Sequence, residues 1–328
     1  MSAALTVFTR FAFVLMLAFA TAASAASFGR QDVKFKSQGL NLAAWLYTPS
    51  DIKAGDKRPA IVMAHGFSAV KEMYLDKFAE QFAAAGFIVL VFDYRYFGDS
   101  EGEPRSQLFP NEQHEDYKNA ITWISMQPNV NADRIGVWGS SYSGGHVLYL
   151  AAYDRRIKAV VAQVPLVNAM DNFRRLVRAD HFPGLVAWLA QDRVERYKTG
   201  KVNYLPVVGQ PGQPSALPTP DSLDWFIKTG QARAPNWKNQ VTVESIEKAL
   251  EYNPAAGIEL ISPTPLLIVV AENDTLTPTD LAIAAYERAR QPKKLVVIPG
   301  AHFDAYTEPG FSYSAPPAVD WFKQNLMQ

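Results

Sequence analysis

Short apolar runs alternate along the chain with longer stretches in which apolar residues recur at helical spacing. Continuous apolar runs are typical of strands buried on both faces of a parallel sheet. Strands that alternate with helices indicate βαβ units and a mostly parallel central sheet flanked by helices. The pattern predicts an opening hairpin over 32–48, strands at 59–66, 87–92, 135–138, 159–162, 266–270 and 295–298, and helices containing Tyr74, Phe78 and Phe82, at 111–126, at 278–290, and through Trp321 and Phe322.

The stretch between Pro165 and about Pro254 interrupts this alternation, because it contains helical pieces but no apolar strand. Its most proline-rich part, from Leu205 to Pro220, is expected to be a loop. We therefore expect a core formed by residues 26–165 and 255–328, with residues 166–254 inserted as a cap or lid. A cap over the carboxyl ends of the strands would control substrate access, whereas the alternative is a segment that merely extends the scaffold.

The first residues have the pattern of a secretory signal peptide. Arg10 precedes the apolar run 11–20, which is too short to span a bilayer, and Ala23-Ser24-Ala25 follows as a cleavage site. We expect residues 1–25 to be removed and the mature protein to be exported, either to the periplasm or into the medium, with no stable membrane span. An uncleaved membrane anchor is the alternative.

Composition narrows the classes of function. The 328 residues are 48% hydrophobic and 20% charged, as in a globular protein with a large core. Lysine plus arginine and aspartate plus glutamate both number 32, so the balanced charge gives no reason to expect a nucleic-acid partner. The absence of cysteine excludes a thiol nucleophile, disulfides and cysteine-based metal sites.

A candidate nucleophile follows the apolar run 135–138. The sequence Gly139-Ser140-Ser141-Tyr142-Ser143 leads from that strand into a helical pattern over 147–152. A strand, a sharp turn built from small residues and a helix form the nucleophile elbow, which exposes a serine hydroxyl above the sheet. The elbow pattern G-x-S-x-G places the nucleophile at Ser141, with a serine in place of the last glycine.

The base and the acid should follow the serine in the order serine, acid, histidine, at the ends of later strands. Of the five histidines, only His302 follows a later predicted strand. The acid is expected after the strand 266–270, where Asp274 stands at the turn before the next helix. Glu272 and Asp304 are the alternatives. The other histidines are placed in an early loop, in helices or in the cap: His65, His114, His146 and His181.

Two backbone N–H groups are needed to stabilise the negative oxygen of the tetrahedral intermediate. The first should come from Tyr142, which follows the nucleophile. The second should come from the loop after the early strand, where Phe67 is best placed and Ser68 is a weaker candidate. His65 would then have a structural role in this loop.

A charged stretch, 93–102, follows the strand 87–92. We expect Asp93 and Arg95 to brace the surrounding loops through charge-assisted hydrogen bonds. Its spacing does not match a metal site, and no G-x-G-x-x-G follows a strand. The sequence therefore predicts neither a metal nor another cofactor.

Taken together, these pieces resemble the α/β-hydrolase superfamily, most closely its dienelactone-hydrolase-like and X-Pro dipeptidyl-peptidase-like branches. The resemblance covers roughly residues 30–165 and 255–328 but not the cap. It implies the α/β-hydrolase fold and a catalytic triad, in enzymes that include esterases, peptidases, lactonases and acyltransferases. Dienelactone hydrolases carry a cysteine nucleophile, so their substrate is not implied. The matching residues are His65-Gly66-Phe67, Asp93-Tyr94-Arg95 with Gly98, Ser100 and Gly102, the elbow from Gly139 to Gly145, Asp274, and Pro299-Gly300 with His302.

The expected function is that of an exported serine hydrolase acting on small-molecule carboxylic esters through an acyl-enzyme. Aromatic residues in the cap, among them Trp188 and Trp225, are candidate substrate contacts. An X-Pro peptidase or amidase is the alternative, and it would need one of the cap acids as an anchor for a substrate amine. An acyltransferase with the same triad, or a binding protein without catalysis, would fit the same fold. The cap acids are Asp171, Asp180, Asp192 and Glu195.

Overall fold

The computed structural model describes residues 27–328, and the expected signal peptide lies outside them. Its centre is an eight-stranded sheet with the strand order β1-β2-β4-β3-β5-β6-β9-β10. β1 and β4 pair antiparallel with β2, whereas the remaining pairings are parallel, so the predicted mostly parallel sheet is confirmed. The strands are β1 (Phe28–Ser37), β2 (Leu40–Pro49), β3 (Arg58–Ala64), β4 (Ile88–Phe92), β5 (Val130–Ser140), β6 (Ile157–Gln163), β9 (Leu266–Ala271) and β10 (Lys293–Ile298).

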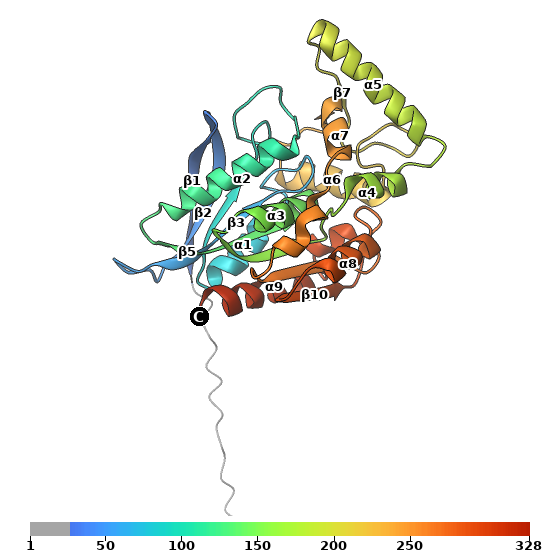
Figure 1. Cartoon of the computed structure of the whole chain (residues 1–328). Helices are drawn as coiled ribbons and strands as arrows, with labels where there is room; N and C mark the ends of the chain where they lie inside the picture. The colour runs from blue at the N-terminus through green and yellow to red at the C-terminus, as the bar shows by residue number, and fades with distance from the viewer. Residues whose placement is uncertain (1–26) are drawn as a thin grey trace, which may run out of the picture.

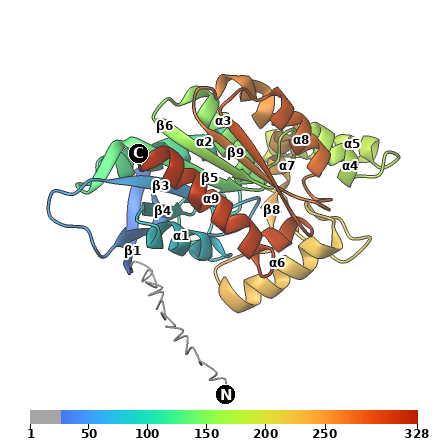
Figure 2. The ribbon, with the colours of Figure 1, turned by 90° about the horizontal axis from the view of Figure 1, so that it is seen from below.

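Helices cover both faces of the sheet, as the βαβ pattern requires. α1 and α9 pack together on one face, whereas α2, α3 and α8 lie on the other (Figures 1 and 2). The core is therefore three-layered and corresponds to the α/β-hydrolase fold. The core helices are α1 (Leu75–Ala84), α2 (Pro110–Ser125), α3 (Tyr142–Tyr153), α8 (Thr279–Arg288) and α9 (Phe311–Leu326), and a short 3-10 helix η2 spans His302–Tyr306.

Several boundaries differ by a few residues from the sequence-based expectation, and two of these differences have a clear physical reason. β5 starts at Val130 rather than at 135, because Val130 pairs with Arg58 of β3, although the polar residues 131–134 that follow lie at a shift in register. Apolar content could not identify that part of the strand. Tyr74 lies just outside α1, at a φ of 67°, so the helix begins one residue later than the aromatic pattern indicates.

The inserted segment, residues 166–254, connects β6 to the elements that lead into β9. Its elements lie together on one side of the core, and α5 projects away from the rest of the molecule (Figure 1). Of its residues, α5 buries only Leu189 and Asp192. No helix within residues 27–328 is long and apolar enough to cross a membrane. The elements are α4 (Ala169–Leu176), α5 (Phe182–Thr199), β7 (Tyr204–Leu205), α6 (Pro220–Arg233), β8 (Val241–Thr242) and α7 (Val243–Leu250), followed by the 3-10 helix η1 (Pro254–Leu260).

Candidate active site

The predicted nucleophile lies in a strained turn between β5 and α3. Ser141 has φ 60° and ψ −119°, a conformation that L-residues rarely adopt. Its N–H donates to the Gln163 carbonyl at 2.9 Å, and its own carbonyl accepts from the N–H of Leu166 at 3.0 Å. The turn is thus fixed by the end of β6 and the residues after it, which stabilises the strained backbone.

The small residues around Ser141 are required by close packing. A Cβ on Gly139 would lie 2.2 Å from the Ser143 carbonyl oxygen, so no other residue fits at that position. Ser143 stands where the elbow pattern has its last glycine. It is fully buried, and its hydroxyl lies 3.0 Å from the Tyr94 hydroxyl. The substitution is therefore accommodated by a buried hydrogen bond.

The predicted acid and base contact each other. The Nδ1 of His302 lies 2.7 Å from Oδ2 of Asp274, and both side chains are buried. Asp274 also accepts from the backbone N–H groups of Leu276 and Thr277, at 2.9 and 2.8 Å. Because its oxygens are occupied in this way, the carboxylate has a fixed orientation and holds the Nδ1–H tautomer of the imidazole.

Ser141 and His302 line the same pocket, although no hydrogen bond joins their side chains among residues 27–328. In unliganded hydrolases the contact between the nucleophile and its base is often long and shortens only when substrate binds. With Nδ1 directed at Asp274, the remaining ring nitrogen Nε2 is the one available for proton exchange with Ser141.

The two expected oxyanion donors are neighbours. Tyr142 is the first residue of α3, so its N–H has no carbonyl partner within the helix. A Cβ built on Gly66 would lie 3.1 Å from the Cβ of Ser141, which brings the start of the Phe67 loop against the nucleophile. The rings of Phe67 and Tyr142 pack edge to face with centroids 5.5 Å apart. The arrangement places both residues beside the serine.

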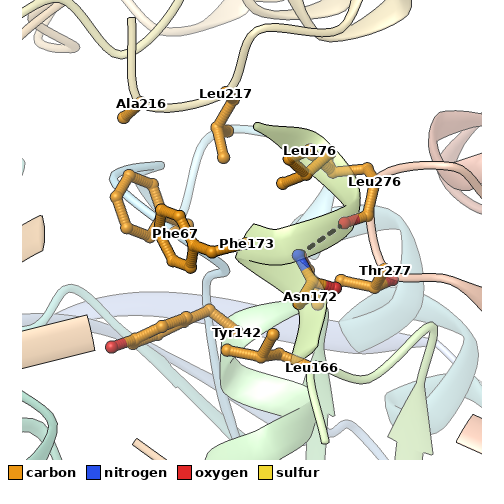
Figure 3. A pocket seen from close by; sticks show the side chains of 11 residues that line it. Phe67, Tyr142, Leu166, Asn172, Phe173, Leu176, Ala216, Leu217, Leu276 and Thr277 are labelled. Carbon is orange, nitrogen blue, oxygen red and sulfur yellow. Dashed lines mark hydrogen bonds between the residues drawn. The ribbon is translucent and has the colours of Figure 1, made fainter. Parts of the chain in front are cut away.

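Two small apolar pockets meet at Ser141. The first is a cavity of about 30 Å³, roofed by α4 and by Leu217 of the proline-rich loop (Figure 3). The second, of about 20 Å³, adjoins His302 and is lined by Trp225 and Phe226 of α6. Each holds space for about one water molecule, so the side chains around Ser141 leave little free volume there. The first pocket's other lining residues are Phe67, Tyr142, Leu166, Asn172, Phe173, Leu176, Ala216, Leu276 and Thr277.

The two tryptophans named as candidate substrate contacts are placed differently. Trp225 lines the second pocket and stacks on Phe303, with centroids 4.8 Å apart. Trp188 lies on α5, is 38% exposed and lines neither pocket. Trp188 lies outside the pockets because α5 points away from the core (Figure 1). Accordingly, few residues of α5 are buried.

Sequence reasoning missed most residues that line the first pocket, among them Thr277, Asn172 and Leu217. Thr277 donates its hydroxyl to Asp274 Oδ2 or to the Val164 carbonyl, both at 2.9 Å, and so helps to orient the acid. Asn172 donates to the Leu276 carbonyl at 3.0 Å and ties α4 to the acid loop. Thr277 could have been found from its position three residues after Asp274. Asn172 and Leu217 belong to the inserted segment, where no pattern marks them.

Comparison with known proteins agrees with this geometry. The family model described as X-Pro dipeptidyl-peptidase (S15 family) matches residues 38–304. The chain belongs to this family. The chain is 31% identical to the quorum-quenching protein AidA of Acinetobacter baumannii (strain MDR-ZJ06). The aligned 295 residues cover 89% of this chain and 94% of AidA.

Fungal relatives of this S15 family member are similarly close. The thiohydrolase aneE of Aspergillus aculeatus is 31% identical over 251 residues, covering 72% of this chain and 76% of aneE. The polyketide transferase grgF of Penicillium sp. is 30% identical over 284 residues, covering 86% and 92%. The crystal structure of the alpha/beta hydrolase GrgF from Penicillium sp. sh18 has a TM-score of 0.78 and covers 92% of this chain and 100% of GrgF. The protein is an α/β hydrolase and a serine hydrolase.

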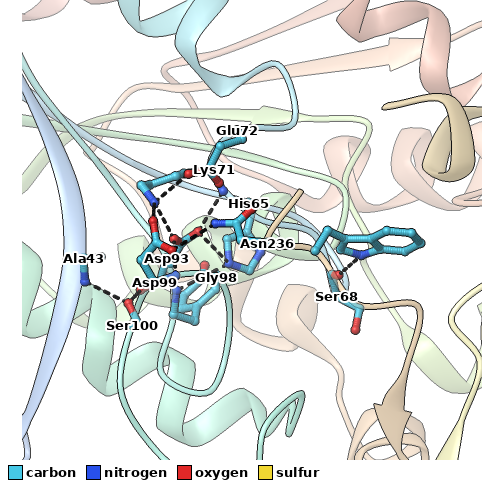
Figure 4. A network of polar contacts seen from close by, with 12 residues as sticks. Ala43, His65, Ser68, Lys71, Glu72, Asp93, Gly98, Asp99, Ser100 and Asn236 are labelled. Carbon is cyan, nitrogen blue, oxygen red and sulfur yellow. Dashed lines mark hydrogen bonds and ion pairs between the residues drawn. The ribbon is translucent and has the colours of Figure 1, made fainter. Parts of the chain in front are cut away.

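The charged stretch after β4 forms two buried ion pairs in this S15 family member. Asp93 pairs with Lys71 at 2.7 Å, and Arg95 pairs with Asp116 at 2.7 Å. Asp93 thus braces the loop before α1, as expected, whereas Arg95 connects to α2 and to Ser37 and Gln38 of the β1–β2 hairpin. The carboxylates of Glu72, Asp93 and Asp99 lie close enough together to ligate a metal ion, but Lys71 Nζ is hydrogen-bonded to all three (Figure 4). The Lys71 ammonium group therefore supplies the positive charge among these three carboxylates.

The remaining histidines lie outside the pockets. His65 is buried at the end of β3, and its Nδ1 lies 3.0 Å from the Gly66 carbonyl oxygen; burial lowers its pKa to about 4. Burial also lowers the pKa of His114 to about 3 and that of His146 well below the ordinary value. His181 is exposed in the inserted segment. Within the pockets at Ser141, His302 is therefore the only imidazole.

Proposed function

We propose that the protein hydrolyses carboxylic esters whose acyl or alcohol part is apolar. The single observation that carries this proposal is the buried Asp274–His302 pair beside a strained serine, in pockets whose walls are mainly apolar. The polar groups of their combined lining are Ser141, His302, Asn172, Thr277, the tyrosine hydroxyls and the indole N–H of Trp225. Apolar walls with a few fixed polar groups are typical of sites for small, largely apolar ligands.

In the proposed mechanism Ser141 Oγ attacks the ester carbonyl carbon while His302 Nε2 accepts the hydroxyl proton. The backbone N–H groups of Phe67 and Tyr142 stabilise the oxyanion of the tetrahedral intermediate. The ester C–O bond then breaks, and His302 donates its proton to the departing alcohol. Water repeats these steps on the acyl-enzyme and releases the carboxylic acid. Asp274 stabilises the imidazolium formed in each half-reaction.

An X-Pro peptidase activity has less support in this chain. Such an enzyme must bind the charged amine of its substrate, yet no aspartate or glutamate lines either pocket within residues 27–328. The acids of the inserted segment have other partners. Asp180 is exposed beside Arg178, Asp192 pairs with Arg196, and Asp171 bonds Asn168. A charged amine would therefore be desolvated without a counter-charge, which is costly.

Acyl transfer is the second candidate function. It is favoured by the small size and mainly apolar lining of the pockets, because an acyltransferase must keep water away from its acyl-enzyme. The relative grgF is named a polyketide transferase, which supports this candidate. Product analysis after incubation of an activated ester with and without an added alcohol separates the two reactions.

The central test uses a fluorophosphonate probe and a panel of p-nitrophenyl esters of graded acyl length. The wild-type protein should be labelled and active, and Ser141→Ala should lose both. Ser140→Ala is the matched control, since the Ser140 hydroxyl bonds Tyr306 and Gln163 and Ser140 lines neither pocket. Retention of full esterase activity by Ser141→Ala would disprove the mechanism. Cleavage of aminoacyl-prolyl anilides but not of esters would favour the peptidase, and absence of any labelling would favour a binding protein.

We also propose that the protein is exported after cleavage behind Ala25. The support is the sequence alone: Arg10, the apolar run 11–20 and the Ala23-Ser24-Ala25 motif. Expression of the full-length chain in a Gram-negative host, fractionation and mass spectrometry of the N-terminus test it. A mature protein that begins at Ala26 outside the cytoplasm is expected, and an intact chain in the cytoplasm would contradict the proposal.

A further inference from the structure

A buried lysine lies among three carboxylates behind the active site (Figure 4). Lys71 is 2% exposed, and its Nζ lies 2.7 Å from Asp93 Oδ2, 2.8 Å from Glu72 Oε1 and 3.1 Å from Asp99 Oδ2. The N–H of Lys71 also donates to Asp93 Oδ1 at 2.8 Å. None of these four residues lines a pocket at Ser141, so the proposed mechanism does not use them directly.

The cluster connects the loop that carries the expected oxyanion donor to the neighbouring strand. Lys71 belongs to the β3–α1 loop, residues 65–74, and follows Phe67 by four positions. Asp93 directly follows β4, which pairs with β3. The main-chain and side-chain contacts of Lys71 with one carboxylate therefore fix the far part of this loop to the sheet.

Apart from the burial of its apolar side chains, the loop has few hydrogen bonds to other elements that could define its shape. Ser68, the residue after Phe67, has a φ of 52°, in the left-handed region that non-glycine residues avoid. Its carbonyl accepts from Trp237 Nε1 at 2.9 Å, and the N–H of Ala69 reaches the Gly66 carbonyl only at 3.4 Å. A strained conformation persists only where its surroundings hold it in place.

Stability alone is a poor explanation for such a cluster. Removing charges from water is costly, and buried ion pairs can often be replaced by apolar side chains without loss of stability. Burial by itself disfavours the charged form of Lys71, but the negative charges of Asp93 and Glu72 hold its pKa above the ordinary value. The ammonium is therefore charged at neutral pH, and its directional contacts can define one loop conformation.

We infer that Lys71 is a positioning residue, whose contacts with Asp93, Glu72 and Asp99 hold the β3–α1 loop so that the Phe67 N–H is aimed at the oxyanion. The inference rests on the proposed function, since it requires Phe67 to be an oxyanion donor. It predicts that loss of the ammonium weakens stabilisation of the transition state more than binding of the substrate.

A second buried ion pair supplies a matched control. Arg95 and Asp116 are also buried, 4% and 0% exposed, and their closest atoms are 2.7 Å apart. Arg95 bonds Asp116 of α2 and also Ser37 and Gln38, and it has no hydrogen bond with residues 65–74. Arg95→Met therefore removes a buried charge of the same kind without releasing the loop.

The experiment compares Lys71→Met, Lys71→Arg and Arg95→Met with the wild type on one p-nitrophenyl ester. For Lys71→Met we expect kcat to fall about 100-fold, as when an oxyanion donor is lost, with KM within about threefold. Lys71→Arg keeps the charge and should recover most of kcat. Arg95→Met should lower the melting temperature while kcat stays within about threefold.

Inhibitors provide a readout that a general structural effect would not reproduce. Ser141 Oγ adds to the carbonyl carbon of a trifluoromethyl ketone, its proton passes to His302, and an oxyanion forms on the ketone oxygen. Affinity for this ketone should fall with kcat in Lys71→Met, whereas affinity for the matching methyl ketone should change little. Equal loss of both affinities, or a normal kcat in Lys71→Met, would overturn the inference.

Milder variants keep the test decisive if Lys71→Met does not fold. Glu72→Gln and Asp99→Asn each remove one carboxylate from the cluster and leave the lysine in place. We expect a reduction of kcat of about three- to tenfold in each, with the same selective loss of trifluoromethyl ketone affinity. Unchanged kcat in both would overturn the inference. Failure of the fluorophosphonate to label the wild type would instead refute the proposed function, so the two failures are distinguishable.

Discussion

His302 and His146 are both buried histidines that contact residues near the nucleophile. His302 and Ser141 line the same pocket, and the ring of His146 packs edge to face on Tyr142 with centroids 4.9 Å apart. Burial and proximity to the serine therefore do not distinguish them. Their partners do, because His302 is bonded to a carboxylate and His146 is bonded to neutral groups.

The hydrogen bonds of His146 are satisfied by a neutral ring. Its Nε2 lies 2.8 Å from Gln113 Oε1 and therefore donates, while Nδ1 accepts from the Tyr252 hydroxyl at 2.8 Å or from His114 Nε2 at 3.0 Å. A second proton, on Nδ1, would make the His146 ring positive beside the His114 ring, and no bonded group supplies a counter-charge. His302, in contrast, has Asp274 to stabilise the imidazolium and a free Nε2 at the pocket. A catalytic histidine thus needs both an anionic partner and an open nitrogen.

The largest effect should separate the two histidine sites. His302→Ala removes the base and should lower kcat/KM by about 10⁶-fold, as loss of the histidine does in serine hydrolases. His114→Gln removes a ring of the neutral cluster and should lower kcat/KM less than tenfold, although it destabilises the fold. Initial rates on a p-nitrophenyl ester measure both. A comparable loss of activity in His114→Gln would show that the neutral cluster takes part in catalysis.

The next effect concerns the carboxylate partner. Asp274→Asn should lower kcat about 10⁴-fold, because the amide favours the wrong imidazole tautomer and leaves the imidazolium without a counter-charge. The alternative acids serve as controls: Glu272 is exposed, and Asp304 accepts from the Ala301 N–H at 2.7 Å. Glu272→Gln and Asp304→Asn should retain kcat within about threefold. The assignment of the acid would be wrong if either control matched the loss in Asp274→Asn.

The sequence predicted the sheet and the residues at its carboxyl ends because both follow from local patterns. Buried parallel strands need continuous apolar runs, and the elbow needs small residues around Ser141. The order of the chain then leaves few candidates for the acid and the base, and the predicted pair, Asp274 and His302, lies 2.7 Å apart in the structure.

The contacts made by the inserted segment were not predictable in the same way. Leu217, Asn172 and Trp225 reach the pockets, whereas Trp188 does not, and all four lie in a region without a repeating pattern. Their placement depends on how α4, α5 and α6 dock on the core. Likewise, the sequence indicated that Asp93 braces a loop, but not that its partner is Lys71. Pairings between distant residues are set by tertiary packing.

The neutral cluster should be visible in the acid stability of the protein. Burial lowers the pKa of His114 to about 3, whereas the unfolded chain has the ordinary value of about 6.5. Below pH 6.5 the unfolded state thus binds a proton that the folded state does not, and the free energy of unfolding falls by about 1.4 kcal/mol per pH unit for this group. The loss continues until the pH approaches the folded pKa, and positive Lys118 nearby acts in the same direction.

Urea unfolding of the wild type and of His114→Gln at pH 7, 6 and 5 measures this slope. The variant should be less stable at pH 7. On acidification, however, its free energy of unfolding should fall less steeply than that of the wild type, by up to about 1.4 kcal/mol per pH unit. His65, whose pKa burial lowers to about 4, keeps a similar contribution in both proteins. Identical slopes would mean that His114 is protonated in the folded state, contrary to the comparison with His302.

The smallest effect should come from the hydroxyl that joins the neutral cluster. Tyr252 Oη lies 2.9 Å from His114 Nε2 and 2.8 Å from His146 Nδ1, so Tyr252→Phe removes one shared hydrogen-bonding group. The two rings remain 3.0 Å apart at these nitrogens and can bond each other, which limits the cost to about 1–2 kcal/mol of unfolding free energy. Because the hydroxyl touches neither Asp274 nor His302, kcat/KM should stay within about twofold. Tyr197→Phe, at a residue 91% exposed on α5, is the matched control and should change neither quantity. A tenfold fall in kcat/KM for Tyr252→Phe would connect the neutral cluster to the geometry of Tyr142 and weaken the distinction between the two histidine sites.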